Sequence, residues 1–269
     1  MLRLLRADLY RAVRFKPFYI LLACNAALAV AVVCYNYDFY RKGLADAFDV
    51  LWAGLGGGAS FLGILSAILI GLFVGSDFSG GARGKLVVAC GRAAFYLSKL
   101  AVGSLLCVLV YLSFHLFTFA LAGPWYGWGG HTLREALLSF AMGIGIVLAY
   151  AAIHTSIAMF TRSTVATVLA GILLALLVLA ASSMLYSPLQ NGCIEFDPAT
   201  GGMAEVECGW PEWVRALARF FLYWAPSAQS SLFGHGDPIP YALCMALSAS
   251  WVLLSTVVGP LFFRKVSLK

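Results

Sequence analysis

The segment YLSKLAVGSLLCVLVYLSFHLFTFALA, residues 96–122, is apolar along nearly its whole length. A helix rises about 1.5 Å per residue and the hydrocarbon core of a bilayer is about 30 Å thick, so roughly 20 apolar residues cross it. Backbone polar groups in lipid must be hydrogen-bonded within the segment, which favours a helix over a strand. This run therefore predicts a transmembrane helix.

Five further runs are long and apolar enough to cross a membrane. The chain of 269 residues is 62% hydrophobic and 11% charged, which excludes a soluble domain. The expected spans lie at about residues 18–36, 51–75, 96–122, 135–160, 164–186 and 240–263. The first run is not expected to be a cleaved signal peptide, because Tyr35, Asn36 and Tyr37 follow it where small residues would mark a cleavage site. We expect an all-α integral membrane protein with six transmembrane helices, residues 1–269 forming a single transmembrane domain.

The Lys and Arg residues are distributed unevenly among the segments that connect these runs. If both termini are cytoplasmic, the inner segments hold most of them, namely Arg3, Arg6, Arg11, Arg14, Lys16, Arg83, Lys85, Arg92, Lys99, Arg162, Arg264, Lys265 and Lys269. Most acidic residues then lie outside, and only Asp8 and Asp77 remain inside. This distribution follows the positive-inside rule and predicts cytoplasmic N and C termini. Because topology explains the net charge of +6, no nucleic-acid partner is expected.

The central parts of the six runs contain no Asp, Glu, Lys or Arg. Ion-coupled carriers generally need such groups within the membrane, so the energy for any transport would enter from outside it. The pair Gly84-Lys85 resembles part of a phosphate-binding loop, but Ser79 and Leu86 stand where that motif needs Gly and Ser or Thr. We expect no catalytic residue, metal site or cofactor in this chain, and we place ATP and Mg in a partner.

The segment GSDFSGGARGKLVVACGRAAFYLSK, residues 75–99, separates the second and third runs. It resembles the first cytoplasmic loop of the ABC-2 type permeases, the membrane subunits of bacterial ABC transporters, which reads like E-F-S-x-G-T-I-R-N-K-L, then G-x-x-R and Y-L-S-K-L. Here Asp77 replaces the usual Glu, and the chain is one residue shorter between Gly81 and Arg83. In that family the loop holds a coupling helix that docks on the ATPase. The resemblance implies a cytoplasmic coupling loop at residues 76–95, with docking residues Asp77, Phe78, Gly81, Arg83, Lys85 and Leu86. Asp77 has an alternative and compatible role, which is to cap the following helix.

Residues 1–16 have the periodicity of a short amphipathic helix. One face carries Leu2, Leu5, Leu9 and Val13, and a neighbouring face carries Arg3, Arg6, Tyr10 and Arg14. A basic amphipathic helix suits the anionic inner leaflet. The segment is similar to the elbow helix of the same family, with Arg3, Arg6, Arg11 and Arg14 at the membrane surface. The alternative is that these arginines only enforce topology.

The expected extracellular loop, residues 187–239, contains Cys193 and Cys208. Short strands at 194–196 and 204–207, separated by turn-forming residues, predict a hairpin. Such a hairpin brings the two thiols close enough for a disulfide, which closes a loop of about sixteen residues and contributes roughly 3 kcal/mol. Two free thiols are the alternative.

Two short helices are expected on the outer surface before the last span. Residues 212–224 predict an amphipathic interfacial helix, with Trp213, Leu217, Phe220 and Trp224 on one side. Residues 220–234, FFLYWAPSAQSSLFG, resemble the short outer helices of ABC-2 permeases and their P-x-x-Q turn.

The resemblance implies a non-catalytic permease subunit in the bacterial cytoplasmic membrane. Its expected partners are two copies of an ABC ATPase, a second copy of itself or a related permease, and the lipid bilayer. The absence of charge from the central parts of the spans favours an amphipathic or apolar cargo such as a peptide, an antimicrobial or a lipid-like molecule. An alternative is an antimicrobial-peptide sensing or immunity component without net transport. A serine protease using Ser60 and His115 is disfavoured, because Phe61 breaks the expected G-x-S-G pattern.

Overall fold

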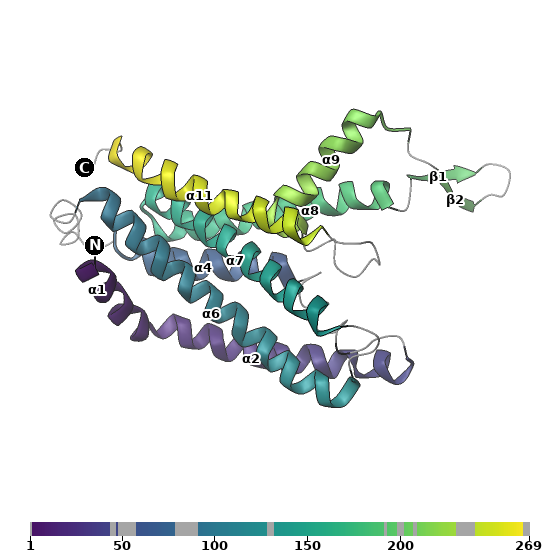
Figure 1. The fold of residues 1–269 in the computed structure, drawn as a ribbon, viewed down its shortest axis with the longest axis horizontal. Helices are drawn as coiled ribbons and strands as arrows, with labels where there is room; N and C mark the ends of the chain where they lie inside the picture. Colours follow the sequence, from purple (N-terminus) through teal and green to yellow (C-terminus); the bar gives the residue numbers. More distant parts are fainter. Residues whose placement is uncertain are drawn as a thin grey trace.

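The computed structural model describes residues 2–43, 47, 58–78, 91–127, 132–190, 193–197, 202–206, 209–229 and 240–265. Over this part of the chain, helices form an elongated bundle and a small hairpin extends from one end (Figure 1). The elements are α1 (Leu2–Val13), α2 (Lys16–Arg41), α4 (Gly58–Gly75), α6 (Arg92–Tyr126), α7 (Leu133–Thr161), α8 (Thr164–Gln190), β1 (Cys193–Asp197), β2 (Gly202–Val206), α9 (Glu212–Trp224), α10 (Pro226–Gln229) and α11 (Tyr241–Lys265).

Five of these helices, α2, α6, α7, α8 and α11, are long and apolar enough to cross a membrane. The length and composition of these helices confirm the expectation of a helical, multi-pass membrane protein. The further apolar helix, α4, has 18 residues. It covers the later part of the span expected at residues 51–75, whereas residues 51–57 lie outside the described part of the chain.

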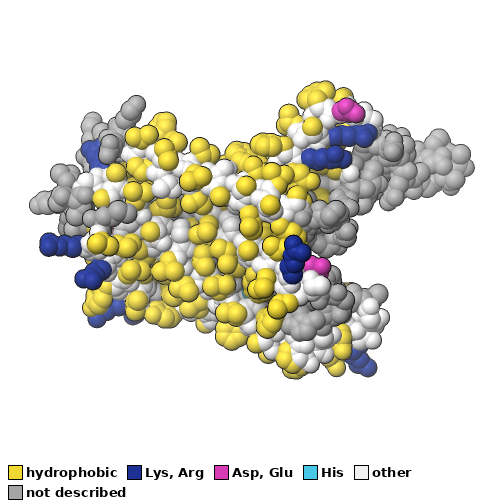
Figure 2. All heavy atoms as spheres, in the orientation of Figure 1, with side chains coloured by type: hydrophobic (Ala, Val, Ile, Leu, Met, Phe, Trp, Pro, Cys, Tyr) yellow, Lys and Arg dark blue, Asp and Glu magenta, His cyan; other side chains and the backbone are white. Residues whose placement is uncertain are grey.

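Helices α4, α6 and α7 form the interior of the bundle, and most of the described side chains of α4 are buried. Within the most apolar stretches of α6 and α7, 44% and 56% of the residues are buried, against 22%, 17% and 22% for α2, α8 and α11. Hydrophobic side chains cover the flank of the bundle, and Lys and Arg side chains lie toward its two ends (Figure 2). A broad apolar flank with charged ends is the surface expected for a protein embedded in lipid.

Glycines allow α4 to approach its neighbours closely. A side chain added at Gly63 would meet the ring of Tyr150 on α7, with its Cβ 2.9 Å from the ring. A Cβ at Gly75 would lie 2.7 Å from the Cα of Thr164 on α8, which is backbone that cannot turn aside. Small residues at helix contacts in membranes permit this approach. These two glycines serve packing within the chain.

The two histidines of the apolar runs are buried and hydrogen-bonded, as expected for packing residues. The Nδ1 atom of His115 lies 3.1 Å from the carbonyl oxygen of Tyr111 on its own helix. The Nδ1 atom of His154 lies 3.0 Å from the hydroxyl of Ser66 on α4. Both histidine side chains are fully enclosed. The side chain of Ser60, the other residue of the protease alternative, lies outside the described part.

The hairpin expected in the outer loop is present. Strands β1 and β2 are antiparallel, with Cys193 opposite Val206 and Asp197 opposite Gly202. Cys208 and the side chain of Cys193 lie outside the described part, so the expected disulfide stays a prediction.

Helix α9 is amphipathic, as its sequence predicts, and it leaves the bundle at an angle beside α8 and α11 (Figure 1). Trp213, Leu217 and Phe220 are exposed, whereas Ala218 and Leu222 are buried against the protein. An exposed apolar stripe on a short charged helix suits the membrane–water interface.

The P-x-x-Q turn anchors α9 and α10 to the last span. The Nε2 group of Gln229 donates hydrogen bonds to the carbonyls of Tyr223 (2.6 Å) and Cys244 (3.1 Å). Its Oε1 atom accepts a hydrogen bond from the hydroxyl of Ser248 at 3.0 Å. Trp224 of α9 also stacks on Trp251 of α11, with ring centroids 4.4 Å apart. Polar and aromatic contacts thus hold this end of the bundle together.

Candidate functional site

Four charged side chains meet at the end of the bundle where α1 lies and α11 ends (Figure 1). They are Asp8 and Arg11 of α1, Asp77 just after α4, and Lys99 in the second turn of α6. We call these four residues the ionic cluster. The bonded pairs are 22, 66 and 91 positions apart in the sequence, so tertiary packing brings them together.

Lys99 joins the two carboxylates of the ionic cluster. Its Nζ atom forms salt bridges with Oδ1 of Asp8 and, at 2.6 Å, with Oδ2 of Asp77. The neighbouring Ser98 donates its hydroxyl to Oδ2 of Asp8 at 2.6 Å. Charged hydrogen bonds of this kind are about twice as strong as neutral ones. The start of α6 is therefore bonded both to α1 and to the end of α4.

Arg11 is bonded to Oδ1 of Asp77, the carboxylate oxygen that Lys99 does not contact in its salt bridge. Its guanidinium group donates to Oδ1 of Asp77, to the carbonyl oxygen of Phe73 and, at 2.7 Å, to the hydroxyl of Ser76. The guanidinium carbon also lies 4.7 Å from the centre of the Phe73 ring, a cation–π arrangement. Arg11 therefore fastens α1 to the last turn of α4.

The cluster is buried although all its members carry charge. The side chains of Lys99, Asp77 and Asp8 are 2%, 3% and 7% exposed, and that of Arg11 is 24% exposed. The Nζ atom of Lys99 also lies 5.2 Å from the ring centres of Phe73 and Phe95. Two acids and two bases balance each other, which satisfies the requirement that buried charges be paired. Removing one partner of such a pair leaves an uncompensated charge and costs about 3–5 kcal/mol.

The bonds of the ionic cluster form a joint between α1, α4 and α6. Asp77 lies two positions before residues 79–90, and Lys99 lies on α6, the helix that follows those residues. The cluster therefore links α1, α4 and α6 into a unit at this end of the bundle.

The structure describes only two of the six docking residues expected in the coupling loop. Asp77 is buried and bonded within the chain, so in this conformation its carboxylate faces the ionic cluster and not a partner surface. Phe78 packs edge to face on Phe95, with ring centroids 6.3 Å apart. The other four, Gly81, Arg83, Lys85 and Leu86, lie outside the described residues, as do the backbone groups that Asp77 would cap.

The short helix expected at residues 1–16 corresponds to α1, and its arginines divide into two groups. Arg3, Arg6 and Arg14 are exposed, whereas Arg11 is half-buried in the ionic cluster. The face that packs on the protein carries Leu4, Asp8 and Ala12. On the face expected to be apolar, Leu5 and Leu9 are partly buried, and Leu2 and Val13 are exposed. The exposed leucine and valine remain available to lipid.

Sequence reasoning missed the roles of Asp8 and Lys99, which it treated only as charges on the inner side. One signal was available for Asp8, which lies four positions after Leu4 and four before Ala12, on the stripe that is buried. Lys99 lies inside the apolar run at residues 96–122, where a lysine needs a partner. An acid on a buried stripe and a lysine within a span together indicate an ion pair.

Within the described ranges, no group of three or more His, Cys, Asp or Glu side chains is placed to hold a metal ion. The hydrogen-bonded pair of Ser66 and His154 is enclosed between α4 and α7 and is not open to a substrate in this conformation.

Comparison with protein-family models finds none that matches this chain. A search of curated proteins likewise finds no significant match.

Proposed function

We propose that this chain is the permease subunit of an ATP-driven transporter of the ABC-2 type, and that a separate ATPase supplies the energy. The observation that carries the proposal is the ionic cluster, which bonds α1 to Asp77, just after α4, and to Lys99 of α6, the two elements on either side of the 79–90 segment. When the ATPase lies outside the membrane, it moves the transporter by displacing a loop that it contacts. That loop must be firmly attached to the helices that move. The joint between α1, α4 and α6 meets that requirement.

In this proposal α4 is the second of six spans. Its 18 residues make about 27 Å of helix at about 1.5 Å per residue, close to the roughly 30 Å of hydrocarbon. The sequence that precedes it, from residue 51, is also apolar. With α4 included, α1 and the end of α11 fall on the same side of the membrane (Figure 1). The positive-inside distribution makes that side the cytoplasm.

The proposed working cycle begins when two partner ATPase subunits bind ATP and close. They move the loop at residues 76–95, and the ionic cluster passes that movement to α1 through Arg11 and to α6 through Lys99. The exposed Arg3, Arg6 and Arg14 hold α1 against anionic lipid headgroups. The spans then switch between two arrangements and carry an amphipathic or apolar cargo. A second permease copy completes the assembly.

The proposal is tested by purifying the chain from the cells that naturally produce it, where an ABC ATPase is expected to co-purify. Reversing two loop charges, Arg83→Glu with Lys85→Glu, is expected to abolish co-purification of the ATPase. The matched control is Arg41→Glu with Lys42→Glu, two adjacent exposed basic residues at the opposite end of the bundle, and it should retain the ATPase. Equal retention by both double variants, or no ATPase bound by the unmodified chain, would contradict the proposal.

Export is separated from protection without transport by a second measurement. The complex is reconstituted in vesicles with ATP inside or outside, and the movement of a fluorescent amphipathic peptide across the membrane is followed. ATP-dependent movement supports export. Peptide binding to the complex without movement supports the sensing or immunity alternative.

A further inference from the structure

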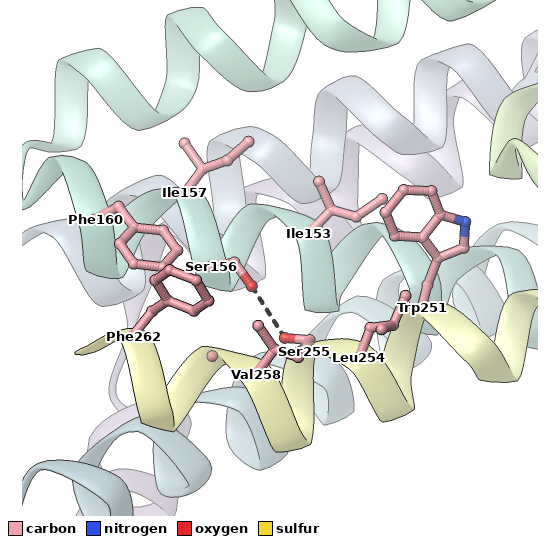
Figure 3. A pocket seen from close by; sticks show the side chains of 10 residues that line it. Ile153, Ser156, Ile157, Phe160, Trp251, Leu254, Ser255, Val258 and Phe262 are labelled. Carbon is pink, nitrogen blue, oxygen red and sulfur yellow. Dashed lines mark hydrogen bonds between the residues drawn. The ribbon is translucent and has the colours of Figure 1, made fainter. Parts of the chain in front are cut away.

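An apolar groove runs along the surface of the bundle between α7 and α11 (Figure 3). It has a volume of about 520 Å³, within the range of pockets that bind small ligands. Ile153, Ile157 and Phe160 line one wall, and Leu254, Val258 and Phe262 line the other. Both walls belong to helices long and apolar enough to span a membrane, so the groove opens toward lipid.

Hydroxyl groups at the base of the groove are bonded to one another and to the backbone. Ser156 and Ser255 lie 3.0 Å apart, and the hydroxyl of Tyr96 on α6 lies 2.8 and 2.6 Å from them. Both serines also donate to the carbonyl oxygen of Ala152, at 2.9 and 3.1 Å. The donors are therefore used within the protein, and the groove offers an occupant mainly apolar contact. A chain of methylene groups fits this chemistry.

The length of the groove matches one leaflet of a bilayer. It extends from Trp251 to Phe262 along α11, and these eleven helical steps span about 16 Å at about 1.5 Å per residue. Half of the hydrocarbon core is about 15 Å thick. The groove occupies the half of α11 nearer its C-terminal end, which is also the end where α1 lies (Figure 1).

Basic residues follow the groove at that end. Phe160 and Phe262 pack edge to face there, with ring centroids 6.4 Å apart. Two positions beyond Phe160, Arg162 ends α7 in a left-handed conformation with φ of 53°. Two positions beyond Phe262, α11 ends with Arg264 and Lys265. Positive charge at the level where a lipid phosphate lies is complementary to an anionic headgroup.

We propose that the groove between α7 and α11 binds one acyl chain of an anionic phospholipid, with Arg162 facing its phosphate. The lipid comes from the leaflet at the end of the bundle where α1 lies. The site requires only that the chain is embedded in a membrane, so it stands independently of the proposed transport function.

Photo-crosslinking tests this site on the full-length purified chain. Phosphatidylglycerol and phosphatidylcholine, each with the same diazirine-bearing acyl chain, are added separately, and labelled peptides are mapped by mass spectrometry. Labelling is expected within residues 153–160 and 251–262, more strongly with phosphatidylglycerol. Labelling spread evenly over the exposed faces of α2 and α8 would overturn the proposal.

Two adjacent valines supply a matched pair of variants. Val258 lines the groove, whereas Val257 is 61% exposed on the neighbouring face of the same helix. Val258→Trp should fill the groove and reduce labelling to background, and Val257→Trp should leave it unchanged. Equal labelling of the two variants refutes the site.

A further pair of variants tests the contact with the lipid headgroup. Arg162→Gln removes the proposed contact, and Lys42→Gln, at the opposite end of the bundle, is the control. A basic residue near the surface strengthens binding of anionic lipid about fivefold, so Arg162→Gln should lower phosphatidylglycerol labelling about fivefold and leave phosphatidylcholine labelling unchanged. A loss with both lipids contradicts the assigned role of Arg162. The alternative result is that the groove takes no lipid label and that Val258→Trp dissociates a dimer of this chain. The occupant of the groove is then a second copy of the chain, and the lipid proposal fails.

Discussion

Replacing Lys99 by methionine tests whether the ionic cluster holds this end of the bundle. The change keeps an unbranched side chain of similar length, but it removes the cation that lies between two carboxylates and over the rings of Phe73 and Phe95. Asp8 then keeps the Ser98 hydroxyl, and Asp77 keeps Arg11. The buried charges no longer balance.

The expected loss of stability follows from burial. Breaking a buried pair from one side costs about 3–5 kcal/mol. For a chain of this size each kcal/mol lowers the melting temperature by about 2–4 °C, so Lys99→Met should lower it by about 6–20 °C. Thermal unfolding in detergent, followed by fluorescence-detected size exclusion, measures this shift. Lys16→Met is the control, since Lys16 is an exposed lysine at the same end, and its effect should be within about 0.5 kcal/mol.

A double variant separates loss of the pair from loss of packing. Asp8→Asn combined with Lys99→Met removes one charge of each sign and leaves the Arg11–Asp77 pair intact. It should be more stable than Lys99→Met alone, with a coupling energy of about 2 kcal/mol between the two sites. Strictly additive effects, or a melting temperature for Lys99→Met equal to that of Lys16→Met, would refute the reasoning.

Two further predictions concern helix packing and the hairpin. Gly75→Ala should lower the free energy of unfolding by about 1–3 kcal/mol, because the new Cβ meets the backbone of Thr164. Gly145→Ala is the control and should be tolerated, since its Cβ has its nearest neighbour at 3.4 Å. Equal melting temperatures of the two variants would contradict this. Alkylation of the unfolded, unreduced chain should leave Cys193 and Cys208 unmodified, since a disulfide here stabilises the hairpin by roughly 3 kcal/mol. Peptide mapping that finds both cysteines alkylated would exclude the bridge.

Hydropathy predicted the helices well because the bilayer imposes one requirement on every span. The apolar runs correspond to α2, α6, α7, α8 and α11, and the structure extends several of them beyond the expected limits. Helix α6 begins at Arg92 and ends at Tyr126, whereas the apolar run suggested residues 96–122. A helix continues past the hydrocarbon as long as its backbone is bonded, and hydropathy does not report those outer turns.

The ionic cluster could not be predicted from hydropathy or from counts of charged residues. Counting charges placed Asp8, Asp77 and Lys99 correctly at one end of the molecule, but a count carries no information about pairing. Asp8 and Lys99 are 91 positions apart, so only the packing of α1 on α6 makes them neighbours. The hairpin shows the opposite case. Its strands are close in sequence, and turn-forming residues alone predicted their pairing.

The use of charge at this joint, in a chain that is otherwise packed with apolar side chains, has a physical reason. Apolar contacts between helices tolerate sliding by small steps, since one methyl group replaces another at little cost. An ion pair with several bonds forms at only one relative position of the two helices. Moving the helices away from that position leaves a buried charge without its partner, at a cost of about 3–5 kcal/mol. Lys99 is bonded to two different elements at once, so α1 and the end of α4 cannot shift separately against α6 without breaking a bond. In the proposed cycle, a force applied to the 79–90 segment reaches the ionic cluster through Asp77 and, along the first two turns of α6, through Lys99, and so moves the three helices together.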